Sequence, residues 1–142
     1  MAVYMENPNG KKYVFTNVSG VSRSKSSLSD ALPMPGQNQQ FVLKVGGVKM
    51  NVSISWTIKD EDTDVSDGTA DSPIRTVADQ IVYIEENFAS GSMAFDWDIK
   101  LVIDWLGLAF YGVFSDFRWD VKAGERLARA SLSIIVSKVE VI

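Results

Sequence analysis

The acidic run from Asp60 to Asp71 holds the residues whose types and spacing come nearest to a known chemical motif. Its first carboxylates alternate, at positions 60, 62 and 64, as the ligands of a calcium loop do. An EF-hand loop needs glycine at its sixth position and glutamate at its twelfth, and this run has Val65 and Asp71 there. We therefore expect a solvated acidic loop and no metal site, with weak calcium binding as the alternative.

Few other residues could support catalysis. Asp96 and Asp98 alternate with Trp97, and two carboxylates on one strand face could act as general acid and base. Ordinary surface charge is the favoured interpretation, because spacing in sequence does not fix separation in space. Histidine and cysteine are absent, and no phosphate-binding glycine loop occurs. We predict that the protein is not an enzyme and has no catalytic residues, no cofactor-binding residues and no cofactor.

The four tryptophans offer a different kind of site, a platform on which sugars could stack. They are Trp56, Trp97, Trp105 and Trp119. Three of the four fall in phase with aliphatic positions, which favours a place in the core. A β-sandwich that binds a ligand such as carbohydrate nevertheless stays open as the alternative function.

Composition limits the classes of protein that fit. The 142 residues, 46% of them apolar, suffice for one core, so we expect a single β-rich domain over residues 1–142. The formal charge of −4 and the lack of a basic run disfavour nucleic-acid binding through a basic face. The longest apolar window, residues 101–114, is broken by Asp104 and is shorter than the roughly 20 residues that span a bilayer.

The elements that would position any site are mostly strands. Residues 48–58 alternate between apolar and polar side chains, which predicts a half-buried strand. Gly46-Gly47 connects this segment to the apolar residues 41–45, so we expect a tight hairpin there. A second alternation, from Ala128 to Val136, predicts a long final strand after a turn at residues 123–125.

Two further patterns lie between those strands. Apolar positions from Ile99 to Trp105 predict a strand that turns at Leu106-Gly107. The apolar phase then shifts from even to odd positions near Ser115-Asp116, which indicates a β-bulge.

One segment has helical spacing. Ser72-Pro73 has the residue types of a helix start, apolar residues recur at helical spacing to Phe88, and Gly91 can end the element. We therefore expect one amphipathic α-helix at about residues 73–89. The expected fold is mainly β, an antiparallel β-sandwich or barrel carrying that helix, with extended loops at about 22–40 and 59–72. The serine-rich segment 22–40 lacks periodicity, which suggests contact with another subunit.

The C-terminal half carries a recognisable combination of motifs. An aromatic-glycine step at residues 110–113 precedes the aromatic strand Phe117-Arg118-Trp119, a Gly124-Glu125 turn and the strand from Ser131 to Val136. Over residues 95–142, and in the preceding order of hairpin, loop and helix, the sequence resembles tail-tube and baseplate-type structural proteins of tailed bacteriophages and related contractile injection systems.

The resemblance implies a function by assembly. A small β-domain of this kind would form rings or stacked rings with copies of itself and with other tail or baseplate proteins. The rings would surround a channel through which DNA passes without specific binding. The implied location is the tail of the virion, after assembly in the host cytoplasm, with no membrane partner. An acidic protein suits such a channel, because negative walls would not trap DNA.

Overall fold

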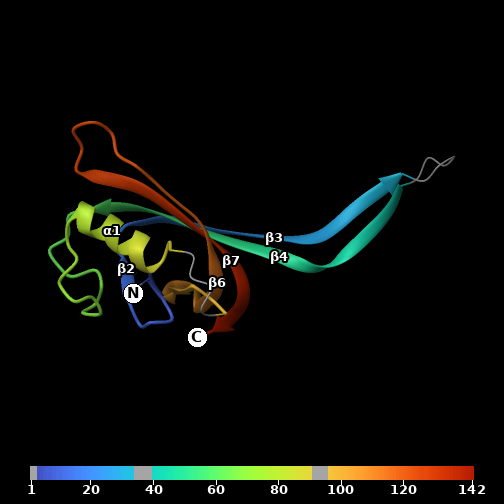
Figure 1. Cartoon of the computed structure of the whole chain (residues 1–142), viewed down its shortest axis with the longest axis horizontal. Helices are drawn as coiled ribbons and strands as arrows, with labels where there is room; N and C mark the ends of the chain where they lie inside the picture. The colour runs from blue at the N-terminus through green and yellow to red at the C-terminus, as the bar shows by residue number, and fades with distance from the viewer. Residues whose placement is uncertain (1–2, 34–39, 91–95) are drawn as a thin grey trace.

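The chain folds into a curled antiparallel sheet of seven strands, in the spatial order β2-β1-β5-β6-β7-β4-β3. A computed structural model describes residues 3–33, 40–90 and 96–142, with the backbone alone described for 27–33 and 40–48. In Figure 1, helix α1 (Val77–Asn87) lies against the sheet at one end of the molecule. The strands are β1 (Val3–Glu6), β2 (Lys12–Phe15), β3 (Val18–Pro33), β4 (Gln40–Lys59), β5 (Ile99–Ile103), β6 (Leu108–Asp120) and β7 (Leu127–Val141).

The core lies on the face of the sheet that packs against α1, here called the inner face. Alternate residues of β4 and β7 are buried there, as their period-two patterns predict. Trp56 is only 1% exposed, and its ring lies 4.7 Å from that of Phe15 and 6.1 Å from that of Phe117. The other large, fully buried side chains are Tyr13, Phe88, Met5, Ile54, Ile58, Ile84, Ile99, Leu101, Ile103, Leu132 and Ile134.

A buried polar network joins α1 to the sheet. The Tyr13 hydroxyl donates to Gln80 Oε1 (2.9 Å) and accepts from Trp56 Nε1 (3.2 Å), while Gln80 Nε2 donates to the Lys59 carbonyl (2.7 Å). Burial raises the pKa of Tyr13 well above its ordinary value, so the hydroxyl stays protonated and remains a donor. The buried polar atoms of Tyr13, Gln80 and Trp56 therefore have partners, which fixes the position of the helix.

The helix is shorter than the sequence predicts. It begins at Val77 rather than near residue 73, and Thr76 is its N-cap, with Oγ1 accepting from the Asp79 amide at 3.2 Å. Residues just before it are held by the acidic loop: Ile74 N donates to Asp64 Oδ1 and Val77 N to Asp60 Oδ1. The predicted end at Gly91 lies outside the described residues. No helix in the described part of the chain is long and apolar enough to cross a membrane.

The irregularities expected in the C-terminal half are confirmed. The β6–β7 register shifts between Phe114 and Asp116, which is the predicted bulge. The strand from Ile99 ends in a short 3-10 turn, η1 (Asp104–Leu106), and Gly107 follows with a φ of 68°, a conformation that favours glycine. Gly112 serves a different purpose, since a Cβ there would lie 2.6 Å from the Ile135 carbonyl oxygen. The aromatic-glycine step thus permits a close β6–β7 contact.

The prediction for the N-terminal half is wrong in two places. Residues 22–33 belong to β3 and not to a loop, and Gly46-Gly47 lies within β4 and is not a turn. Ser27 pairs with Val48 and Ser29 with Lys44, so the two glycines sit at a register shift between long antiparallel strands. The segment connecting β3 to β4, residues 34–39, lies outside the described residues. By contrast, residues 60–72 form no strand or helix, as the sequence predicts, and the loop continues through residues 73–76, where the sequence predicts helix.

Candidate assembly surface

The strands β3 and β4 extend beyond the rest of the sheet as a two-stranded ribbon, clearly visible in Figure 1. The β4–β7 pairing ends at Asn51 and Ile135, whereas the β3–β4 pairing continues to Pro33 and Gln40. Beyond Asn51, therefore, no third strand among the described residues supports the ribbon. A two-stranded ribbon is at best marginally stable in water, so a ribbon of this length suits a segment that packs against another subunit.

The open edge of the sheet lies on the same element. The sheet ends at β2 on one side and at β3 on the other. The acidic loop covers β2, because Val14 N donates to the Val65 carbonyl and Lys12 N donates to Thr69 Oγ1. In the described residues no strand pairs with the other side of β3. An uncovered edge strand presents unpaired backbone groups, which are a template for pairing with another chain.

Hydrogen bonds to one of its own carboxylates hold the acidic loop together. Asp64 Oδ1 accepts from Ser66 N (2.9 Å), Ser66 Oγ (2.6 Å) and Ile74 N (3.0 Å), and Oδ2 accepts from Gly68 N (3.2 Å). Among the residues that the structure describes, no group of three or more potential ligands is arranged around a common point. The Asp64 carboxylate, in the middle of the acidic run, thus holds the turn that covers β2.

This scaffold predicts a pH dependence of stability. Desolvation acts to raise the pKa of Asp64, but the hydrogen bonds from Ser66, Ile74 and Gly68 outweigh it and lower the pKa below 3.8. A lowered folded-state pKa contributes stability above the unfolded pKa, and that stability is lost as pH falls through the folded value. We expect Asp64→Asn to unfold at lower urea concentration than the native chain at pH 7, and the difference to shrink below about pH 4.

The control for this experiment is Asp62→Asn, which makes the same carboxylate-to-amide change at an exposed residue two positions away. We expect its urea midpoint to stay near that of the native chain at both pH values. An Asp64→Asn midpoint that differs from the native one equally at pH 7 and pH 3 would contradict the assignment.

The second carboxylate pair does not form a site. Asp98 is 7% exposed, and its Oδ2 accepts from Phe114 N at 3.2 Å, whereas Asp96 is exposed. Neither residue lies in a strand, so their spacing does not place the two carboxylates on one strand face. Asp98 instead fastens the start of β5 to β6.

Of the tryptophans in phase with core positions, only Trp56 is buried. Trp105 is 50% exposed and Trp119 is 45% exposed, so the core prediction is wrong for both. Trp105 lies in η1 rather than in a strand. Trp119 is in register with the buried Ala130, but residues 118–120 of β6 are exposed, and the Trp119 indole N–H donates to Glu85 Oε1 at 3.4 Å. Trp97 lies edge-on to Tyr111 with ring centroids 5.2 Å apart.

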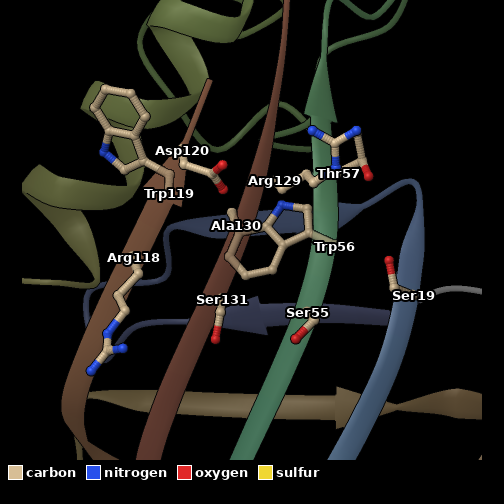
Figure 2. A pocket seen from close by; sticks show the side chains of 10 residues that line it. All are labelled: Ser19, Ser55, Trp56, Thr57, Arg118, Trp119, Asp120, Arg129, Ala130 and Ser131. Carbon is tan, nitrogen blue, oxygen red and sulfur yellow. The ribbon is translucent and has the colours of Figure 1, made fainter. Parts of the chain in front are cut away.

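An open hollow of about 550 Å³ lies over β4, β6 and β7, and Figure 2 shows its lining. Its charged side chains are Arg118, Asp120 and Arg129. The rest of the lining consists of four hydroxyl residues and three apolar ones, namely Ser19, Ser55, Thr57 and Ser131, and Trp56, Trp119 and Ala130. The hollow contains neither a nucleophile paired with a base nor a set of metal ligands. The hollow is an open surface of mixed apolar and polar side chains.

Sequence reasoning missed the ribbon and the open edge of β3. One signal could have revealed them: residues 21–32 contain no glycine or proline, which is unusual for a long loop. Residues 22–26 of β3 are exposed, so neither strand face is buried and no alternation results.

Comparison with known proteins identifies the fold. No protein-family model and no curated protein matches the sequence. Among solved structures, a chain in the tail of an empty gene transfer agent (GTA) particle, obtained with C6 symmetry, matches 100% of this chain and 95% of its own length, with a TM-score of 0.53 and 9% identity. A chain of the native GTA virion matches 99% of this chain and 95% of its own, with a TM-score of 0.54 and 9% identity.

A chain in the baseplate of the anti-feeding prophage covers 99% of this chain and 91% of its own length, at a TM-score of 0.47 and 12% identity. The two gene transfer agent matches span nearly the whole of both chains, so this chain shares its fold with a chain of that tail and with a chain of that virion. This agrees with the class of protein that the C-terminal motifs resemble.

Proposed function

We propose that the chain is a structural subunit of a phage-type tail, either of the tail tube or of a baseplate ring. The observation that carries the proposal is the match in fold, over essentially the full length, to chains of gene transfer agent particles. One of those tails was obtained with C6 symmetry, which is the arrangement of a ring of equivalent subunits.

The ribbon and the β3 edge supply the means of assembly. A cyclic ring needs a heterologous contact, in which one patch of each subunit meets a different patch of the next. The open β3 edge offers backbone groups for such a contact, and the ribbon extends far enough from the sheet to reach a neighbour. The energy of ordering the ribbon is then offset by the interface that it buries.

The subunit would act without catalysis, in the tail of the virion, after assembly in the host cytoplasm. Copies of the chain, together with other tail or baseplate proteins, would surround a channel through which DNA passes. Its function would rest on shape and on the chemistry of its surfaces.

The proposal predicts that the purified full chain assembles at micromolar concentration. Light scattering should give a mass several times that of the 15.7 kDa chain, and negative-stain micrographs should show rings or tubes. A chain that stays monomeric at all concentrations and binds glycans on an array would overturn the proposal and support the carbohydrate-binding alternative.

A further inference from the structure

The charges of this chain are separated between the two sides of the sheet. Residues 60–86, which form the acidic loop and α1, carry nine carboxylates and a single basic residue, Arg75. Asp79, Glu85 and Glu86 are exposed on the helix, which packs by its other side on the inner face. Half of the chain's eighteen carboxylates therefore lie in the part of the molecule that covers the inner face.

The opposite face of the sheet, here called the outer face, has the reverse balance. Among the residues whose side chains the structure describes, strand register places seven basic residues and four carboxylates on it, although the chain as a whole has a charge of −4. The basic residues are Lys12, Lys49, Lys59, Lys100, Arg118, Arg129 and Lys138, and the carboxylates are Glu6, Asp116, Asp120 and Glu140.

Hydroxyl groups occupy much of the rest of the outer face. Ser22, Ser53 and Ser133 lie side by side on β3, β4 and β7, and the Oγ atoms of Ser53 and Ser133 are 2.8 Å apart. In the next row, Ser55 pairs with Ser131. These side chains are short and uncharged. Because one hydroxyl of the Ser53–Ser133 pair donates to the other, one of these two remains free to donate outward, as do the hydroxyl groups of residues outside the pair.

A row of lysines crosses the other half of the outer face. The register aligns Lys12, Glu6, Lys100, Tyr111 and Lys138 on five successive strands from β2 to β7. Every second strand carries a lysine, and strands lie about 4.8 Å apart, so the lysines recur at roughly 10 Å. Such a row is a regular ladder of positive charge across the sheet.

The ammonium groups of this ladder rest on aromatic rings. Lys100 Nζ lies 5.4 Å and Lys138 Nζ 5.0 Å from the centroid of Tyr111, and Lys12 Nζ lies 5.1 Å from that of Tyr4. In the described residues no carboxylate is within 4.0 Å of Lys12 or Lys100, although Glu6 lies between them, whereas Lys138 Nζ lies 3.6 Å from Glu140 Oε2. A hydrogen bond to Tyr111 is the main cause that raises the pKa of Lys100, which therefore stays charged at neutral pH.

We infer that the outer face is a weak, sequence-independent contact surface for the phosphate backbone of duplex DNA, an inference that rests on the proposed tail function. Ammonium and hydroxyl groups are the side chains that contact phosphates without reading sequence. The faces of Tyr4 and Tyr111 are covered by lysines, which disfavours the stacking of unpaired bases and favours a backbone contact.

This inference revises the expectation of uniformly negative channel walls. The negative charge is concentrated over the inner face, and the outer face would present hydroxyl groups and a few spaced cations to the DNA. Interspersed carboxylates such as Glu6 and Glu140 keep the attraction small. A surface of this kind holds a duplex loosely without trapping it, because few phosphates are neutralised.

The experiment measures the anisotropy of a labelled duplex of about 30 base pairs with the full chain, over roughly 20 to 200 mM salt. We expect binding at the lowest salt that is lost by the highest. The variant K100Q/K138Q should bind about tenfold more weakly and flatten the logarithmic salt dependence by about 2, one for each lost phosphate contact. Circular dichroism checks that its fold is native.

A matched control removes the same charge elsewhere. The variant R75Q/K122Q changes two exposed residues off the outer face and has the same net charge as K100Q/K138Q. Its affinity should remain within about twofold of the native value. Equal weakening in both variants, or no DNA binding by the native chain at about 20 mM salt, would overturn the inference. Displacement of the duplex by equal charge concentrations of polyglutamate or of phosphatidylserine vesicles would also overturn it.

Light scattering on the same samples separates this inference from the proposed function. Assembly without DNA binding would leave the tail function standing and defeat the inference. DNA binding by a chain that never assembles would defeat the tail function, and with it the role assigned to the face.

Discussion

Removal of the β3–β4 ribbon is expected to abolish assembly while leaving the sheet folded. Ser24 and Asn51 are paired across the two strands, close to where β7 stops supporting β4. Deleting residues 25–50 and joining Ser24 to Asn51 through Asn-Gly places a two-residue hairpin turn at a matched pair. All core residues from Val52 onward are kept, so the body retains its packing.

The shortened chain is examined for fold by circular dichroism and for mass by light scattering. We expect native-like β-structure and the mass of a monomer at concentrations where the full chain forms rings. A shortened chain that folds and still reaches the oligomeric mass of the full chain would show that the ribbon is not the assembly element. Deleting part of β3 alone would be a poorer experiment, because it would leave the N-terminal half of β4 unpaired.

Replacing Trp56 with alanine is expected to cost about 3 to 5 kcal/mol of unfolding free energy. Trp56 is 1% exposed and lies at the centre of an aromatic cluster that includes Tyr13, Phe15 and Phe117. Its indole N–H also donates to the Tyr13 hydroxyl, which connects through Gln80 to the helix. The substitution would leave a large cavity and weaken the attachment of α1 at the same time.

Urea unfolding of the full chain and of two variants measures this cost. The control is Trp105→Ala, since Trp105 is 50% exposed in η1, and we expect it to cost less than about 1 kcal/mol. Similar losses in the two variants would mean that Trp56 does not anchor the core. If Trp56→Ala does not fold at all, Trp56→Phe keeps a ring in the cluster and should still be measurably less stable than the native chain.

The parts of the fold that bury one strand face were predictable from the sequence. Along β4 from Val52 to Ile58 and along β7 from Ala128 to Ile134, burial on the inner face imposes a period of two, which is visible in the residues. The bulge near Ser115 was predictable for the same reason, because a shifted register must shift the apolar phase. The motifs at residues 110–136 lie in β6, in β7 and in the turn between them, and they suggested the resemblance to tail-tube and baseplate-type proteins.

Helix boundaries were less predictable, because local signals competed with tertiary contacts. Ser72-Pro73 has the residue types of a helix start, but the carboxylates of Asp60 and Asp64 bind backbone amides of Val77 and Ile74. Those contacts hold the segment in an extended path until Thr76 can cap the helix. These contacts cannot be predicted from residues 72–76 alone, because the carboxylates lie ten or more residues earlier in the chain.

By itself the sequence determined the mainly β fold, the positions of the buried strand faces, and the absence of histidine and cysteine chemistry. Only the tertiary structure decided that residues 22–33 form a strand, and that lysines from β2, β5 and β7 align in one row. The physical reason is that a strand with one buried face must alternate apolar and polar residues, whereas an exposed strand need not. Surfaces for assembly are exposed in the single subunit, and their residues come together only through strand register.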